Sequence, residues 1–278
     1  MQNFTELETL FDQCGIDYSQ PGFYDSPAFK RYENINSNFL NFYADYIQAK
    51  KYSEQYIVEA RKTILEVVDY LFCRLAGKGQ KGDCANASMV LSRILDEKRI
   101  WNCTVKGSLK ILVQTKKGLQ AVAAFHPFRL LGSSTDFGHI WLFAPPFKVI
   151  DLTILLQNYP KQLEEILSHN LQKYVLEKSA LAVKLVVSDL MEARFVQDFL
   201  SKYKKSPTEL DLDRMSPGLL KRLNKYGVFE ISKKAIILRY STCAITASDL
   251  PLTQMQNLCL NGEYPDNIYK SFLKFKQQ

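Results

Sequence analysis

The spacing of hydrophobic residues changes twice along the chain and divides it into three parts. From about residue 36 to residue 76, apolar side chains recur largely every three or four positions, which predicts amphipathic helix. A shorter helix is expected from Asp83 onward, because Asp is a favoured N-cap and the apolar positions between 87 and 95 share one helical face. Residues 1–76 are therefore predicted to form a helical N-terminal region.

After residue 102 the hydrophobic pattern becomes β-like, as in half-buried strands. Breaks rich in Gly, Lys, Ser or Pro separate four such segments, at residues 103–113, 119–125, 138–143 and 149–153. Short segments that follow one another in this way favour an antiparallel sheet. We expect residues 77–158 to form a core in which the helix that follows Asp83 packs on this sheet.

The last part, residues 159–278, is predicted to be largely helical and basic. Helix is expected from residue 160 to about residue 205, followed by a short helix at 217–227 and a short strand pair around Lys233 and Lys234. The predicted cross-strand neighbours in that pair are Ile231 with Ile236 and Phe229 with Leu238. A helical start, a helix-and-sheet centre and a mixed end indicate the α+β class, with helical flanks on both sides of the core.

One cysteine occupies a position that suits a nucleophile. Cys84 directly follows the predicted N-cap and lies on the inward face of the first helical turn. The unpaired N–H groups and the positive end of a helix favour a thiolate, and the same groups can stabilise an oxyanion formed on attack. For a lone cysteine the alternative is a small buried side chain that fills space, so the assignment depends on its neighbours.

A histidine and an aspartate lie in the predicted hairpin further along the chain. If the hairpin closes through residues 144–146, positions whose numbers sum to 290 are paired, and His139 faces Asp151. Directly opposed side chains share a face with Cβ atoms roughly 4.5–5.5 Å apart, which suits a hydrogen bond between imidazole and carboxylate. Asp151 would then orient His139 and leave the second ring nitrogen for Cys84.

Other arrangements of the three histidines are less well supported. His126 and Asp136 flank a possible turn, but Asp136 lies in a polar stretch that predicts a loop, and His169 fits a surface position on a helix. A zinc site is conceivable, yet the spacing of its candidate ligands matches none of the usual patterns. Those candidates are Cys84, Cys103, His126 and His139. Neither a metal nor another cofactor is expected.

These residues resemble the signature of the transglutaminase-like (papain-like) superfamily of cysteine enzymes. The matching segments are Gly82-Asp-Cys84, 101–107, His139-Ile-Trp141 and Asp151-Leu-Thr153, within residues 80–154. The chain departs from the family beside the aspartate, where Val149-Ile150 and Leu152 replace the Trp and Pro that the family often carries.

The resemblance implies a papain-like core with Cys84 as nucleophile, His139 as general base and acid, Asp151 as orienter and a thioacyl-enzyme intermediate. It also makes Gln80 the candidate side-chain donor to the oxyanion. The family leaves the fate of the acyl group open between protease, amidase or deamidase activity and acyl transfer. Hydrolysis needs no second substrate site and is our working expectation, with a protein or peptide as substrate.

Composition and charge add a second hypothesis. The 278 residues are 46% hydrophobic and 23% charged with a net charge of +7, and residues 201–240 alone have a net charge of +6. Such a cluster on a helix and hairpin could bind nucleic acid or dock an acidic partner, which would fit a binding protein or an inactive interaction module. A solvated lysine-rich face is the simpler interpretation of this segment.

Two further features bear on the setting of the protein. No uncharged apolar run approaches the roughly 20 residues that a membrane helix needs, so no membrane association is expected. The six cysteines are scattered without a Cys-x-x-Cys pair, which indicates reduced thiols and a cytoplasmic location.

Overall fold

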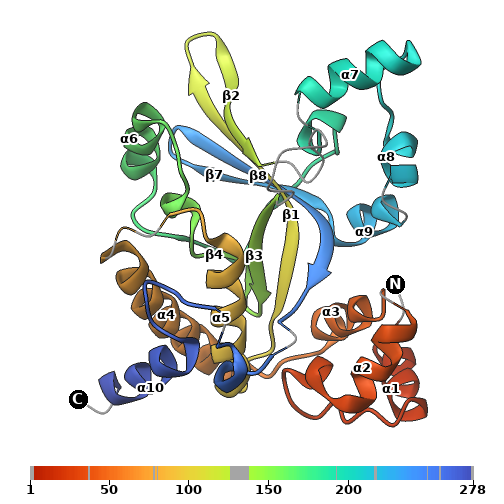
Figure 1. The fold of residues 1–278 in the computed structure, drawn as a ribbon, viewed down its shortest axis with the longest axis vertical. Helices are drawn as coiled ribbons and strands as arrows, with labels where there is room; N and C mark the ends of the chain where they lie inside the picture. Colours follow the sequence, from red (N-terminus) through yellow and green to blue (C-terminus); the bar gives the residue numbers. More distant parts are fainter. Residues whose placement is uncertain are drawn as a thin grey trace.

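The computed structural model describes residues 3–36, 38–77, 79, 81–125, 138–191, 193–215, 218–248, 250–256 and 258–276. Within these ranges the chain combines α-helices with one antiparallel sheet, which confirms the α+β class (Figure 1). The helices are α1 (Phe4–Gln13), α2 (Pro27–Ile35), α3 (Leu40–Ala49), α4 (Glu54–Gly77), α5 (Cys84–Glu97), α6 (Lys161–Asn170), α7 (Ala193–Tyr203), α8 (Glu209–Met215), α9 (Leu219–Tyr226) and α10 (Pro265–Phe275). The strands are β1 (Cys103–Thr115), β2 (Gly118–Phe125), β3 (His139–Ala144), β4 (Phe147–Asp151), β5 (Val175–Glu177), β6 (Leu181–Ala182), β7 (Val228–Lys233) and β8 (Ile236–Thr246).

The long strand β1 organises the sheet. Along one edge it pairs with β8, and along the other it pairs first with β3 and then with β2, so that β2 and β3 lie end to end. The complete strand order is β5-β4-β3-β1-β8-β7-β6, and all pairs are antiparallel. The β1–β2 hairpin therefore extends beyond the rest of the sheet, as Figure 1 shows.

Helices α4, α5 and α10 pack together on the β3–β4 part of the sheet (Figure 1). Their contact is a cluster of buried side chains, most of them aliphatic, with aromatic rings from β4 and α10. Its members include Ile64, Leu71, Val90, Leu91, Leu142, Ile150 and Phe272. Burial of a full aliphatic side chain stabilises the fold by about 1.5–3 kcal/mol, so this cluster holds α5 firmly against the strand that begins with His139.

A second cluster joins α1, α2 and α3 to the sheet and is rich in aromatic residues. The rings pack edge to face or tilted against one another, which is the arrangement that aromatic quadrupoles favour. Its members include Phe11, Phe23, Tyr46, Trp101, Trp141 and Tyr240. Trp141 and Tyr240 extend this aromatic packing to β3 and β8, the two strands that flank β1.

The β3–β4 hairpin corrects the predicted register. Ala144 pairs with Phe147, so Pro145 and Pro146 alone form the loop, and Leu142 pairs with Ile150 after an irregularity that adds one residue to β4. The shorter loop and the extra residue each move the register by one position. Because the two shifts add to two residues, His139 and Asp151 keep a common face but lie diagonally across the hairpin instead of directly opposite.

The C-terminal part departs further from its prediction. The expected helix from 160 to 205 is interrupted, because β5, β6 and a 3₁₀ turn separate α6 from α7. The β7–β8 hairpin pairs Phe229 with Tyr240 and Ile231 with Leu238, since a turn at Lys234 and Ala235 needs the two residues that the predicted register omitted. The predicted short strand pair also underestimates β8, which continues to Thr246 along β1.

Gly107 allows three strands to meet beside His139. It pairs with His139 on β3 and with Thr242 on β8, at an irregularity in the β1–β8 pairing. A Cβ atom at this position would lie 2.0 Å from the carbonyl oxygen of Ser241 and 2.7 Å from the ring of Trp141. Only glycine permits so close an approach of the backbone and the indole ring.

The substitution Gly107→Ala is expected to reduce the free energy of unfolding by about 3 kcal/mol, because the added methyl group collides with backbone that cannot move alone. Urea denaturation followed by circular dichroism measures this loss. Gly77→Ala is the matched control, since no atom lies within 4 Å of its added Cβ. Equal effects of the two substitutions would contradict the steric role of Gly107.

Candidate active site

Cys84 is the first residue of α5, as the sequence predicts. Asp83 occupies the N-cap, but its side chain makes no capping hydrogen bond to the first turn. One turn further on, the Ser88 hydroxyl donates a hydrogen bond to the carbonyl of Ile140 over 3.2 Å and ties the helix to β3. The Cys84 side chain therefore lies at the uncapped, positive end of a helix that is packed against the strand bearing His139.

His139 and Asp151 form a hydrogen-bonded pair that is completely buried. The Nε2 atom of His139 lies 2.6 Å from Oδ2 of Asp151, from which we assign the proton on Nε2 as the donor. The second ring nitrogen, Nδ1, makes no hydrogen bond within the described part of the chain. The ring is therefore oriented with Nδ1 available and Nε2 anchored.

Two other groups hold the Asp151 carboxylate. The Tyr240 hydroxyl donates to Oδ2 over 2.9 Å, and the backbone N–H of Thr153 donates to Oδ1 over 3.1 Å. Sequence reasoning missed Tyr240, because nothing near residue 240 indicates that β8 lies beside β1. The predicted Asp-x-Thr segment did contain Thr153. Its backbone N–H lies close to the Asp151 carboxylate because the two residues are only two positions apart in the chain.

Aromatic rings enclose the imidazole. The indole of Trp141 stacks on it with ring centres 6.3 Å apart and an interplanar angle of 24°, and Phe125 lies against it at 5.5 Å. The Trp141 ring also packs edge to face on Tyr240. Water is thus excluded from the His139–Asp151 hydrogen bond, which strengthens the electrostatic interaction between the two groups.

The electrostatic surroundings favour protonated His139. Burial lowers its pKa, but the Asp151 carboxylate and the adjacent Cys84 thiol outweigh burial and raise the pKa above the ordinary value of 6.5. Burial, followed by the charge of Asp151, raises the pKa of Tyr240 well above its ordinary value. Tyr240 therefore stays neutral and continues to donate to Asp151.

Of the remaining candidates from the sequence, the two that the structure describes, His169 and Cys103, do not join this cluster. Gln80, His126 and Asp136 lie outside the described residues. His169 is exposed at the end of α6, and Cys103 is buried within β1, where burial raises the pKa of its thiol. Among the residues that the structure describes, no group of three or more His, Cys, Asp or Glu side chains could hold a metal ion.

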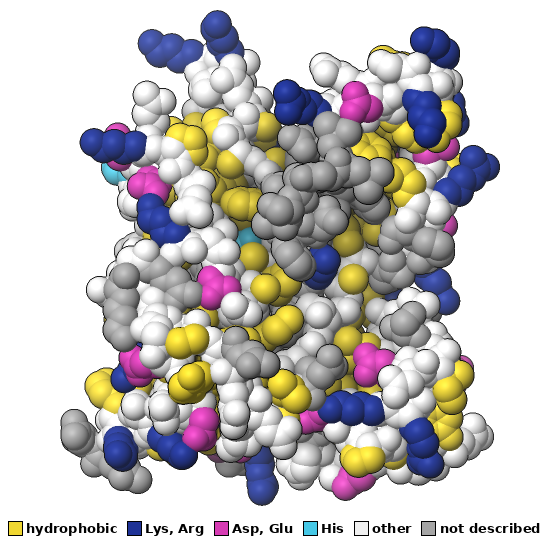
Figure 2. Space-filling model, viewed as in Figure 1, with side chains coloured by type: hydrophobic (Ala, Val, Ile, Leu, Met, Phe, Trp, Pro, Cys, Tyr) yellow, Lys and Arg dark blue, Asp and Glu magenta, His cyan; other side chains and the backbone are white. Residues whose placement is uncertain are grey.

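The basic segment 201–240 is partly engaged within the fold. Five of its cationic side chains form ion pairs with described residues, and three of these pairs use acids from other parts of the chain. The pairs are Lys205–Asp211, Arg214–Asp211, Lys225–Asp45, Lys233–Glu177 and Arg239–Asp189. Figure 2 shows Lys and Arg side chains mostly dispersed around the margin of one face, with acids among them. This arrangement gives little support to a nucleic-acid interface.

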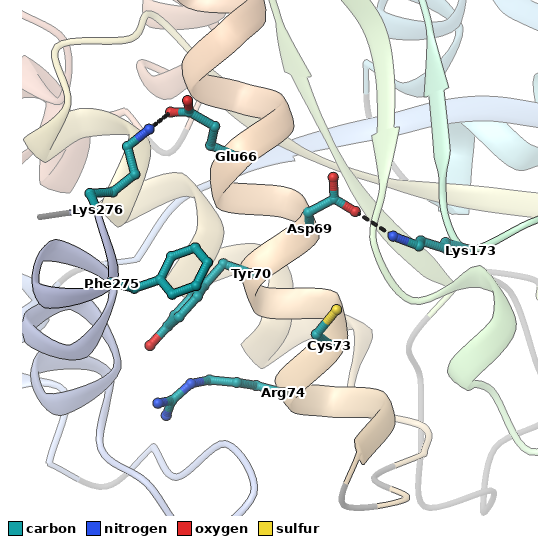
Figure 3. Close-up of a pocket in the computed structure, with 8 residues that line it drawn as sticks. All are labelled: Glu66, Asp69, Tyr70, Cys73, Arg74, Lys173, Phe275 and Lys276. Carbon is teal, nitrogen blue, oxygen red and sulfur yellow. Dashed lines mark hydrogen bonds and ion pairs between the residues drawn. The ribbon is translucent and has the colours of Figure 1, made fainter. Parts of the chain in front are cut away.

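A cavity of about 640 Å³ lies away from Cys84, His139 and Asp151, between α4, α10 and Lys173 (Figure 3). The rings of Tyr70 and Phe275 lie against each other on one side of it. Its charged groups are paired with one another or with nearby acids. The pairs are Asp69–Lys173 at 2.8 Å, Glu66–Lys276 and Arg74–Glu263. No histidine is among the residues that line this cavity beside Cys73, so it lacks the Cys–His combination found around Cys84.

No helix among the described residues is long and apolar enough to cross a membrane. Comparison of the chain with protein-family models, curated proteins and solved structures finds no match in any of the three. The geometry of the site is therefore the basis for its proposed chemistry.

The raised pKa of His139 predicts a pH-dependent stability. The folded protein binds this proton more tightly than the unfolded chain, so the stabilisation is complete below about pH 6.5 and is lost as the pH rises through the folded-state pKa. The advantage of the wild type over His139→Gln in the free energy of unfolding should therefore shrink by more than about 1 kcal/mol from pH 6.5 to 9.5. Urea titrations at several pH values measure it.

The matched control for this measurement is His169→Gln, which replaces an exposed histidine. Its stability should follow that of the wild type throughout the same pH range. A constant difference between wild type and His139→Gln would contradict the proposed coupling of His139 to Asp151.

Proposed function

We propose that this protein is a cysteine hydrolase of papain-like type that acts on an amide bond in a protein or peptide. The observation that carries the proposal is the buried His139–Asp151 pair beside the thiol at the start of α5, in which Nδ1 of His139 has no hydrogen-bond partner among the described residues. A nucleophile, a base and an orienting carboxylate in this order provide the minimal set for covalent catalysis.

In the first step, transfer of the Cys84 thiol proton to Nδ1 of His139 gives a thiolate and an imidazolium, which is the form of His139 that its raised pKa favours. The thiolate attacks the carbonyl carbon of the amide, and the N–H groups of the first turn of α5 stabilise the negative oxygen. The tetrahedral intermediate then collapses as the C–N bond breaks. The departing amine takes the proton from His139 and leaves a thioester on Cys84.

In the second step water replaces the amine. His139 removes a proton from the water, the resulting hydroxide attacks the thioester carbon, and the C–S bond breaks to release a carboxylic acid. Throughout, Asp151 keeps Nε2 protonated and the ring in one orientation, because its own oxygens are fixed by Tyr240 and Thr153. If an amine replaced water in this step, the same groups would perform acyl transfer.

The alternative hypotheses use residues 201–240 for nucleic acid or for an acidic protein partner. The ion pairs of Lys225, Lys233 and Arg239 weaken both, since a paired cation has less charge to offer a phosphate or a carboxylate. If the Cys84 thiol proves inert, the hypothesis of an inactive interaction module is favoured instead.

Iodoacetamide near neutral pH should alkylate Cys84 faster than the exposed Cys73 and Cys259, because the neighbouring imidazolium and the helix end favour its thiolate. His139→Ala should slow this alkylation by on the order of 10²-fold or more. Asp151→Asn should slow it as well, since the ring loses its charged partner. Mass spectrometry of labelled peptides measures each rate.

Cys243 provides the internal control, because its exposed fraction of 7% matches the 8% of Cys84 and it lies on a strand instead of at a helix start. Its labelling should be slow in the wild type and unchanged in both variants. Preferential labelling of any cysteine other than Cys84 would overturn the assignment of the nucleophile.

A further inference from the structure

Tyr159 has a buried hydroxyl group with no hydrogen-bond partner in the described part of the chain. It lies on the connection between β4 and α6, just before Pro160 and the first turn of α6. A buried, unsatisfied hydroxyl destabilises a fold, because it has given up water without gaining another partner. The retention of this unsatisfied hydroxyl group needs an explanation, and its location suggests a functional one.

The connection that bears Tyr159 crosses the loop directly before Cys84. The backbone N–H of Gly82 donates to the carbonyl of Leu156 over 2.7 Å. The side chain of Asn158 is close enough that a Cβ atom added to Gly82 would lie 3.1 Å from its Nδ2. Tyr159 is the residue that follows Asn158, so its side chain lies near the start of α5.

The phenol ring and the imidazole share one aromatic neighbour. Phe125 packs edge to face on Tyr159 with ring centres 6.0 Å apart and contacts His139 at 5.5 Å. Burial, and then the charges of Asp151 and Cys84, raise the pKa of Tyr159 well above its ordinary value of 10.0. The group therefore stays neutral and keeps a proton to donate beside a reactive thiol.

We infer that Tyr159 is an oxyanion donor, whose hydroxyl binds the negative oxygen formed when Cys84 attacks a carbonyl carbon. This inference rests on the proposed function and adds a residue to it. In the attack, the S–C bond forms, the C=O π electrons move to oxygen, and the Tyr159 O–H donates a hydrogen bond without transferring its proton. When the intermediate collapses, the electrons return and the leaving group departs with the proton of His139.

The lack of a hydrogen-bond partner among the described residues is what makes the hydroxyl useful. A donor that is already bonded must break that bond before it can help, whereas this one gains its acceptor as the charge develops. Its interaction is therefore made mainly in the transition state, which is the condition for lowering the barrier. With the first-turn N–H groups of α5, it would bind the oxygen from a second direction.

Tyr159→Phe in the full-length chain tests the inference with two reagents that both consume the Cys84 thiolate. Acylation by p-nitrophenyl acetate passes through an oxyanion, whereas alkylation by iodoacetamide displaces iodide and forms none. The variant should acylate Cys84 on the order of 10²- to 10³-fold more slowly than the wild type. Its alkylation rate should stay within about two-fold, since the thiolate itself is unchanged.

Tyr52→Phe is the matched control, because it removes a tyrosine hydroxyl that donates to the carbonyl of Ile47 and has no place in the proposed oxyanion site. Both of its rates should equal those of the wild type. Thermal denaturation provides a further check: Tyr159→Phe should be at least as stable as the wild type because it deletes an unsatisfied group, whereas Tyr52→Phe should be less stable.

Each other outcome has a definite meaning. Unchanged acylation in Tyr159→Phe would overturn the inference and leave the proposed hydrolase intact. A parallel fall of acylation and alkylation would also overturn it, since Tyr159 would then act on the thiol instead of the oxyanion. If the ester failed to acylate Cys84 in the wild type although iodoacetamide alkylated it, the proposed acyl chemistry would fail first and the inference with it.

Discussion

The candidate site depends on the hydrogen bonds that hold the buried carboxylate of Asp151. A charge that is removed from water is stable only if hydrogen bonds replace its hydration, and Asp151 receives three, from His139, Tyr240 and the backbone of Thr153. These donors come from β3, β8 and the segment after β4. Removal of one partner from such a buried pair costs about 3–5 kcal/mol, because the remaining charge is left uncompensated. The strands are therefore held in register by the same group that orients the imidazole.

The helix that presents Cys84 is fixed to this arrangement through apolar packing. Its inner face fills the space between α4, α10 and β3, and Ser88 bonds to the backbone of Ile140 next to His139. The thiol and the imidazole are thus placed by two independent forces, one hydrophobic and one electrostatic. Gly107 brings them together, since a larger residue would separate β1 from β8 and displace the Trp141 ring that stacks on His139.

Local features of the fold could be predicted from the sequence, whereas long-range ones could not. The start of α5 was predicted from Asp83 and the apolar spacing after it, although the Asp83 side chain makes no capping hydrogen bond. The strand pattern from residue 103 onward follows from alternation. The shared face of His139 and Asp151 was also predicted, although the register was wrong, because two compensating shifts preserve the parity of a strand. By contrast, Tyr240 and Tyr159 approach the site through tertiary packing, and no spacing near either residue indicates that approach.

Because Tyr240 lies late in the chain, the candidate site can be completed only late in synthesis. The Tyr240 hydroxyl bonds to a residue 89 positions earlier in the chain, and β8 occupies a whole edge of β1. During synthesis, the segment that bears Cys84, His139 and Asp151 emerges from the ribosome well before β8 does. Until β8 arrives, β1 has an open edge and Asp151 lacks one of its three donors. The chain thus completes the surroundings of its imidazole only when most of its length has been made, so a product interrupted before β8 lacks one of the three hydrogen bonds to Asp151.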